Sequence, residues 1–205
     1  MTSTRLVLVR HGQCEYAIED GPLTELGRRQ TQAVATALEI SGDDIICASE
    51  LRRAIETAET FGYPINVVVG LREFDFGPQA PAAEALIEAR VDLTLWRATD
   101  GFSGGETIGS FQKRVNETME QLVGAYEGRR VIACTHAGFV DAAIRWAYGI
   151  GPDGDWLTEA EIANASITEF EHWMRGRHPE GAPRHTLIRR IGDVVHLSPE
   201  MRSDN

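Results

Sequence analysis

The sequence predicts an α/β protein: a single three-layer domain in which a central, mostly parallel sheet is flanked by helices. Short apolar runs rich in Val and Ile alternate along the chain with longer segments whose apolar residues recur every three or four positions. The first run is apolar at every position, which is typical of a strand buried on both faces of a parallel sheet. With 205 residues, 42% of them hydrophobic, the chain can bury one good core, and we expect one domain over residues 1–205.

Six segments are expected to be strands. The four predicted to be parallel are Leu6–Val9, Ile45–Ala48, Ile65–Val69 and Val131–Cys134. The last two, Ser166–Glu171 and Thr186–Leu197, are predicted to pair antiparallel at the C-terminal edge of the sheet. We expect the final segment to fold back at its Gly192-Asp193 dipeptide, which is a turn signal.

Five segments carry the apolar spacing of a helix. They run from Thr24 to Ser41, from Ser49 to Phe61, from Ala82 to Trp96, from Ile108 to Tyr126 and from Phe139 to Ala147. Thr24 is a suitable N-cap for the first. The segment from Ile108 has the most regular apolar face, whereas the periodicity from Ala82 is weaker.

Charge and cysteine content exclude several classes of protein. A net charge of −11 argues against a nucleic-acid binder and against a protein that docks on anionic membranes, because both need a basic surface. Cys14, Cys47 and Cys134 are odd in number and lack metal-ligand spacing, so neither a disulfide framework nor a zinc site is expected. No apolar run approaches the roughly 18 residues of a membrane helix, and the N-terminus lacks a signal-peptide pattern. We therefore expect a cytoplasmic protein.

Charged and ionisable residues follow the predicted strands at their carboxyl ends. Arg10 and His11 follow the first strand, Glu73 lies in the loop after the third, and His136 follows the fourth. Arg53 lies in the first turns of the helix after the second strand. Right-handed crossovers between parallel strands bring these ends to one rim of the sheet, where ligands bind in open α/β folds. The sequence therefore predicts a cleft that holds two arginines, two histidines and one carboxylate.

This set of side chains suits phosphoryl transfer. Arginine guanidinium groups match phosphate oxygens, and helix N-termini add backbone donors. A neutral histidine can attack phosphorus and form a phosphohistidine that water later opens. Each residue taken alone has an ordinary explanation: Arg53 could pair with Glu50 or Glu56 on the helix surface, and Glu73 and His136 could be loop residues. Their joint placement after buried strands is what favours a site.

Six stretches of the chain carry a more specific pattern. They are Leu8–Gln13, Pro22–Gly27, Ser49–Ala58, Leu71–Gly77, Gly104–Thr107 and Thr135–Gly138. In this order they resemble the motifs of the histidine phosphatase superfamily, also called the phosphoglycerate-mutase-like family. Two later stretches, Asn164–Thr168 and Val195–Leu197, are similar to that family's C-terminal strands. The resemblance spans nearly the whole chain and implies the family's α/β fold.

The resemblance implies a role for each residue of the predicted cleft. His11 is similar to the family's nucleophile, and Arg10 and Arg53 to its phosphate clamp, which Gly12 in the same turn would complete. His136 resembles the second pocket histidine, which stabilises the transferring group, and Glu73 resembles the proton donor. No metal and no cofactor are implied, because the guanidinium groups would neutralise the phosphate charge.

Three positions refine this picture. Glu106 resembles the family's carboxylate near the nucleophile, and we expect it to be structural or orienting here. Ala17 stands where many members carry an asparagine, so one phosphate donor is expected to be missing. His136 is followed by Ala137 rather than by the aspartate of the acid-phosphatase branch, which favours Glu73 as the acid.

The expected function is hydrolysis of a small phosphorylated metabolite by a monomer or homodimer. The alternatives are a cofactor-dependent phosphoglycerate mutase, a phosphohistidine protein phosphatase and a non-enzymatic module that binds phosphorylated ligands. The binding module is disfavoured because all five groups of the cleft are present. The segment from Pro78 to Ser103 is expected to cap the site and set its specificity.

Overall fold

A six-stranded sheet with the order β3-β2-β4-β1-β5-β6 forms the centre of the computed structural model. The model describes residues 2–15, 20–79, 97–156, 159–174 and 185–202. The strands are β1 (Thr4–Arg10), β2 (Ile45–Ala48), β3 (Ile65–Val67), β4 (Arg130–Thr135), β5 (Ile167–Trp173) and β6 (His185–Asp193). β3, β2, β4 and β1 are mutually parallel, whereas β5 is antiparallel to both of its neighbours. This confirms the predicted antiparallel pairing at the C-terminal edge.

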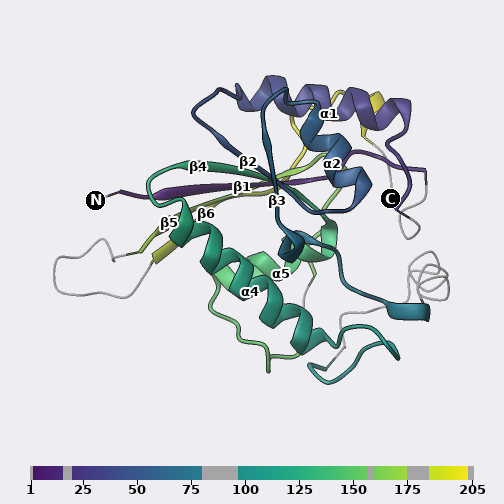
Figure 1. Cartoon of the computed structure of the whole chain (residues 1–205), viewed down its shortest axis with the longest axis vertical. Coiled ribbons are helices and arrows are strands. Elements are labelled where there is room, and N and C mark those ends of the chain that lie inside the picture. Colours follow the sequence, from purple (N-terminus) through teal and green to yellow (C-terminus); the bar gives the residue numbers. More distant parts are fainter. Residues whose placement is uncertain (1, 16–19, 80–96, 157–158, 175–184, 203–205) are drawn as a thin grey trace.

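Helices cover both faces of the sheet, as Figure 1 shows. α1 (Glu25–Leu38) and α2 (Arg52–Glu59) lie on one face, and α4 (Ile108–Ala125) and α5 (Ala137–Ala147) lie on the other. Short 3-10 turns are found at Val69–Leu71, Gly77–Gln79 and Pro199–Met201. The predicted three-layer α/β domain is therefore confirmed.

The apolar run of β1 packs against both helical layers. Leu6 and Leu8 belong to the core shared with α4 and α5, whereas Val7 and Val9 belong to the core shared with α1 and α2. All four side chains are at most 1% exposed. Burying each contributes about 1.5 to 3 kcal/mol relative to leaving it in water. The strand that carries the predicted nucleophile is thus fixed from both sides.

The pairing of β1 with its neighbours sets the geometry of the rim. β1 and β4 run parallel in a register that places Arg10 opposite Thr135, so the residues that follow these two strands emerge side by side. On the other side of β1, the backbone N–H of Ala165 donates to the carbonyls of Arg10 and His11. Ala165 has a φ of 56°, and this left-handed residue turns the chain into β5.

Several predicted boundaries were wrong. β3 ends at Val67 rather than Val69, because the chain turns there into the 3-10 turn Val69–Leu71. α1 ends at Leu38, since Glu39 adopts a left-handed conformation with a φ of 46°. β6 ends at Asp193, and the similarity of Val195–Leu197 to a further strand does not hold. The Asp193 carboxylate accepts a hydrogen bond from the N–H of Val195 and forms a turn instead.

Two expectations concern residues that the structure does not describe. The helix predicted over 82–96 lies outside the described residues, as does Ala17. Among the helices that the structure does describe, none is long and apolar enough to cross a membrane.

Candidate active site

The predicted site residues of the strand ends lie together in the structure. His11 follows β1 and His136 follows β4, and their ring centroids are 5.2 Å apart. Arg53, on the first turn of α2, donates from Nε to His11 Nε2 over 3.2 Å. The three side chains are no more than 4% exposed. Arg53 therefore faces the histidines, and it is its neighbour Arg52 that pairs with Glu56 on the helix surface.

The turn after β1 is held by α1 and α2. A side chain at Gly12 would place its Cβ 2.6 Å from the carbonyl oxygen of Gly27 in α1, so only glycine allows this close packing. The N–H of Gly12 donates to Thr57 Oγ1, which in turn donates to the carbonyl of Arg53. Thr57, which the sequence analysis did not single out, therefore links the turn to α2. The phosphate-binding role of Gly12 stays a prediction.

The hydrogen bonds of His11 define which ring nitrogen is reactive. Nδ1 lies 2.8 Å from the carbonyl oxygen of Gly12, and because a carbonyl only accepts, Nδ1 carries the proton. Nε2 is then unprotonated, and its lone pair accepts from Arg53 Nε. Burial, followed by the charges of Arg10 and Arg53, lowers the pKa of His11 well below its ordinary value. At neutral pH the ring is thus uncharged, and its role as the nucleophile stays a prediction.

His136 and Arg10 present buried donors that have no protein acceptor. Neither ring nitrogen of His136 has a hydrogen-bond partner among the described residues, and the same is true of Arg10 Nε. Arg10 Nη1 donates to the carbonyl of Ile162, which orients the guanidinium group. Burial lowers the pKa of Arg10 only to about 10, so the group stays cationic. The three nitrogen atoms without a described partner, on two residues beside His11 and Arg53, form a cluster that is suited to an anionic ligand.

Burial also controls the charge of His136. Desolvation lowers the pKa of this ring well below its ordinary value, and the nearby positive charges of Arg53 and Arg10 add to the effect. The imidazole is therefore neutral at pH 7 and can offer one N–H to a ligand. His136 is the N-cap residue of α5, and its backbone carbonyl accepts from the N–H of Val140 in that helix. The side chain of His136 makes no cap hydrogen bond.

Glu73 meets the same site through the N-terminus of α5. One carboxylate oxygen accepts from the N–H of Phe74 over 2.9 Å, and the other accepts from the N–H of Gly138 over 3.2 Å. A Cβ at residue 138 would lie 2.5 Å from Glu73 Oε1, so the glycine is what lets the carboxylate approach. The Glu73 carboxylate thus binds the N–H of a residue that lies two positions after His136, at the N-terminal end of α5, which attracts negative charge.

Further polar residues that the sequence analysis did not assign to the site complete its surroundings. Asp20 pairs with Arg53 Nη1 at 3.3 Å, and the amide of Asn164 donates to the carbonyl of His11 over 3.3 Å. Arg114 of α4 binds both carboxylate oxygens of Glu106, which also accepts from the N–H of Asp75. Glu106 therefore contacts the loop of Glu73, while the structural or orienting role expected for it stays a prediction.

The cysteines are not arranged for catalysis. All three are free thiols, and only Cys14 is partly exposed. Burial raises the pKa of Cys14, and it raises that of Cys47 to about 11, so neither is a thiolate at neutral pH. Among the described residues, no group of three or more His, Cys, Asp or Glu side chains could hold a metal ion.

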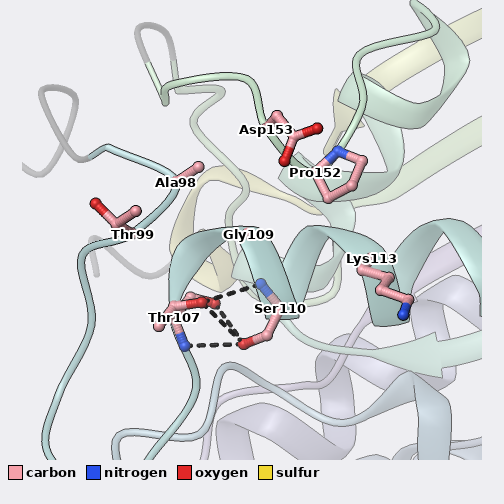
Figure 2. A pocket seen from close by; sticks show the side chains of 8 residues that line it. All are labelled: Ala98, Thr99, Thr107, Gly109, Ser110, Lys113, Pro152 and Asp153. Atoms are coloured by element: carbon pink, nitrogen blue, oxygen red, sulfur yellow. Dashed lines mark hydrogen bonds between the residues drawn. The ribbon is translucent and has the colours of Figure 1, made fainter.

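An open hollow of about 450 Å³ lies away from these residues, at the start of α4 (Figure 2). It is lined by Ala98, Thr99, Thr107, Gly109, Ser110, Lys113, Pro152 and Asp153. Thr107 and Ser110 already bond each other as a reciprocal helix cap. The hollow contains none of the predicted site residues, and we do not assign the chemistry to it.

Comparison with known proteins agrees with this geometry. The family model for the histidine phosphatase superfamily (branch 1) matches residues 6–181. The chain is 32% identical to the glucosyl-3-phosphoglycerate phosphatase of Mycobacterium tuberculosis. The alignment covers 100% of this chain and 99% of the relative. It is also 32% identical to the putative phosphoserine phosphatase 2 of Hydrogenobacter thermophilus, over 81% of this chain and 88% of that protein.

A solved structure leads to the same family. The native structure of a mycobacterial glucosyl-3-phosphoglycerate phosphatase matches with a TM-score of 0.70 at 27% identity, covering 91% of this chain and 98% of that chain. The family model spans most of the chain, from residue 6 to residue 181. The chain belongs to the histidine phosphatase superfamily, branch 1.

Proposed function

We propose that this protein is a phosphomonoester hydrolase that acts on a small phosphorylated metabolite through a phosphohistidine at His11. The observation that carries the proposal is the pairing of a neutral His11, whose unprotonated Nε2 accepts from Arg53, with buried donors on His136 and Arg10 that have no acceptor among the described residues. These donors suit the oxygens of a phosphate, and the lone pair suits attack on its phosphorus. The phosphatase names of the relatives support the same reaction class.

In the first step of the proposed reaction, the Nε2 lone pair forms a bond to phosphorus while the bond to the leaving oxygen breaks. Arg10, Arg53 and His136 would stabilise the charge on the transferring oxygens, a task that requires fixed donors rather than covalent chemistry. Glu73, entering as the protonated acid, would give its proton to the leaving oxygen.

In the second step, water attacks the phosphohistidine. The carboxylate of Glu73 takes a proton from this water as the new oxygen–phosphorus bond forms and the bond to Nε2 breaks. Phosphate leaves, while His11 regains its lone pair and Glu73 its proton. The hydrogen bond from Nδ1 to the Gly12 carbonyl keeps the same tautomer through both steps.

A paired assay separates this reaction from that of a mutase. A mutase must keep water from its phosphoenzyme while the substrate reorients. The chain from Gly12 to Pro22 is short relative to the pattern that the resemblance implies, and 32 residues separate Glu73 from Glu106, which leaves little material for a closed lid. Water should therefore capture the phosphoenzyme.

The test follows inorganic phosphate and the interconversion of 2- and 3-phosphoglycerate in one preparation primed with bisphosphoglycerate. Glucosyl-3-phosphoglycerate, phosphoserine and a phosphohistidine peptide complete the panel, and each assay is repeated with a chelator. We expect net phosphate release, negligible isomerisation and no effect of the chelator. Isomerisation faster than phosphate release would reject the hydrolase in favour of the mutase, and preference for the peptide would favour a protein phosphatase.

A further inference from the structure

Arg114 of α4 holds the backbone of the loop that carries Glu73. Its Nη1 donates to the carbonyls of Gly70 and Arg72 over 2.8 and 3.0 Å, and its Nη2 donates to the carbonyl of Glu73 over 3.2 Å. The opposite side of the guanidinium group is fixed by Glu106, which accepts from Nε at 2.8 Å and from Nη2 at 2.7 Å. One side chain therefore fixes three carbonyls within four residues.

Neighbouring contacts leave this loop little freedom to shift. Gly70 packs so closely on α4 that a Cβ there would lie 2.2 Å from Thr118 Oγ1. Glu106, besides binding Arg114, accepts a hydrogen bond from the N–H of Asp75 over 3.1 Å. The segment that contains Glu73 is thus tied to α4 both before and after the carboxylate. The side chains of Arg114 and Glu106 are each 20% exposed, so water screens their attraction only in part.

We propose that Arg114 is a positioning residue for proton transfer, acting through Glu73. The arginine fixes the backbone of the loop, and the Glu73 carboxylate then stays on the N–H of Gly138, close to His136. A displacement of about 1 Å in a catalytic group can cost on the order of 100-fold in rate. This inference rests on the proposed function, because Glu73 must be the proton donor.

The leaving group distinguishes positioning from a merely structural role. A poor leaving group such as an alkoxide needs the proton of Glu73, whereas nitrophenolate leaves without it. Loss of Arg114 should therefore slow the hydrolysis of an alkyl phosphate much more than that of p-nitrophenyl phosphate. A general loss of folded protein would slow both reactions equally.

The experiment compares Arg114→Lys with Glu73→Gln on both substrates. We expect Glu73→Gln to lose about 100-fold on the alkyl phosphate. Arg114→Lys, which keeps the charge but loses the fork that binds several carbonyls, should lose roughly 10-fold on the alkyl phosphate and little on nitrophenyl phosphate. In the double variant, Arg114→Lys should add less than about 2-fold to the loss from Glu73→Gln, because both changes act on one proton transfer.

Arg145 provides a matched control. It is also a helical arginine that donates to two loop carbonyls, those of Gly154 and Asp155, but it is more deeply buried than Arg114 and its loop does not carry Glu73. Arg145→Lys should change both substrates by the same factor. A second variant is needed if Arg114→Lys does not fold. Glu106→Gln keeps the volume of the Glu106 side chain but weakens its hold on Arg114. We expect it, too, to slow the alkyl phosphate more than nitrophenyl phosphate.

The outcomes separate this inference from the proposed function. If the wild-type protein hydrolyses neither substrate, the proposed function fails and the inference with it. If Glu73→Gln shows the leaving-group effect while Arg114→Lys and Glu106→Gln slow both substrates equally, the hydrolase stands and the positioning role is overturned. Additive losses in the double variant would overturn it as well.

Discussion

The ends of β1 and β4 look alike in sequence but differ in their hydrogen bonds. A histidine follows each strand directly, and the two rings lie side by side at the same rim of the sheet. The ring of His11 is engaged at both nitrogens, by the Gly12 carbonyl and by Arg53, whereas the ring of His136 has no partner among the described residues. The same residue type at matching strand ends is therefore in two different hydrogen-bonding states, which suit the two roles that we propose, nucleophile for His11 and donor for His136.

The path of the backbone explains the difference. After His11 the chain enters a tight turn, and the carbonyl of Gly12 points back at Nδ1. After His136 the chain enters α5 at once, and the carbonyl of His136 accepts from the N–H of Val140 in the helix ladder. Neither ring nitrogen of His136 has a hydrogen-bond partner among the described residues. The backbone thus fixes the tautomer of His11, whereas the part of the chain that the structure describes leaves the tautomer of His136 open.

The largest expected effect separates the two histidines directly. We expect His11→Ala to lower turnover by roughly 10⁴-fold or more, since the nucleophile is lost. Rapid quenching with labelled substrate should trap an acid-labile, base-stable phosphoenzyme in the wild-type protein and none in the variant. Label that persists in His11→Ala would place the nucleophile elsewhere, and His136 would be the first residue to test.

A smaller effect is expected at the β4 end. His136→Gln should lower kcat by about 10² to 10³-fold, as for the loss of one donor to a developing oxyanion. The phosphoenzyme should still form on His11, but more slowly. If His136→Gln abolished trapping as completely as His11→Ala, the two strand ends would have to share the covalent step. Single-turnover measurements on both variants decide between these results.

Much of this arrangement could be predicted from the sequence, because buried strands and their polar ends are local features. The apolar run before Arg10 predicted both the strand and the point at which it ends. The same reasoning predicted that His136 follows the end of a neighbouring strand. Arg114 was missed because it lies in a helix between the core residues Phe111 and Val115, where a charged side chain reads as surface. Its three carbonyl partners lie about 40 residues earlier, and no helical pattern reports such a contact.

The smallest expected effect concerns stability against pH. The folded pKa of His136 is lowered, so below about pH 6.5 the unfolded chain binds a proton that the folded chain refuses. Stability should therefore fall as the pH drops from 6.5 toward the folded pKa, by up to about 1.4 kcal/mol per pH unit for each such histidine. His11 behaves in the same way. Removing either ring should reduce the slope of the unfolding free energy against pH by up to the amount that one bound proton contributes.

Urea unfolding of the wild-type protein and of His136→Gln at pH 7.5, 6 and 5 checks this prediction. Asp141, whose pKa burial raises to about 6, acts in the opposite direction in both proteins, so the difference between them isolates His136. Equal slopes in the two proteins would show that the ring is charged in the folded state. His11→Ala measured in the same way would show whether the two histidines contribute equally to the pH dependence of the free energy of unfolding.

The place of β1 within the sheet also determines when the site can form during synthesis. β1 lies between β4 and β5, whose residues follow it by more than 120 and 150 positions. At synthesis rates of about 5 to 20 residues per second, the first strand waits several seconds or more for its partners. Such distant pairings slow folding, because the chain loses the entropy of closing a long loop before the contacts between the strands stabilise it. The histidine that would carry out the covalent step is thus made well before the two strands that complete its surroundings.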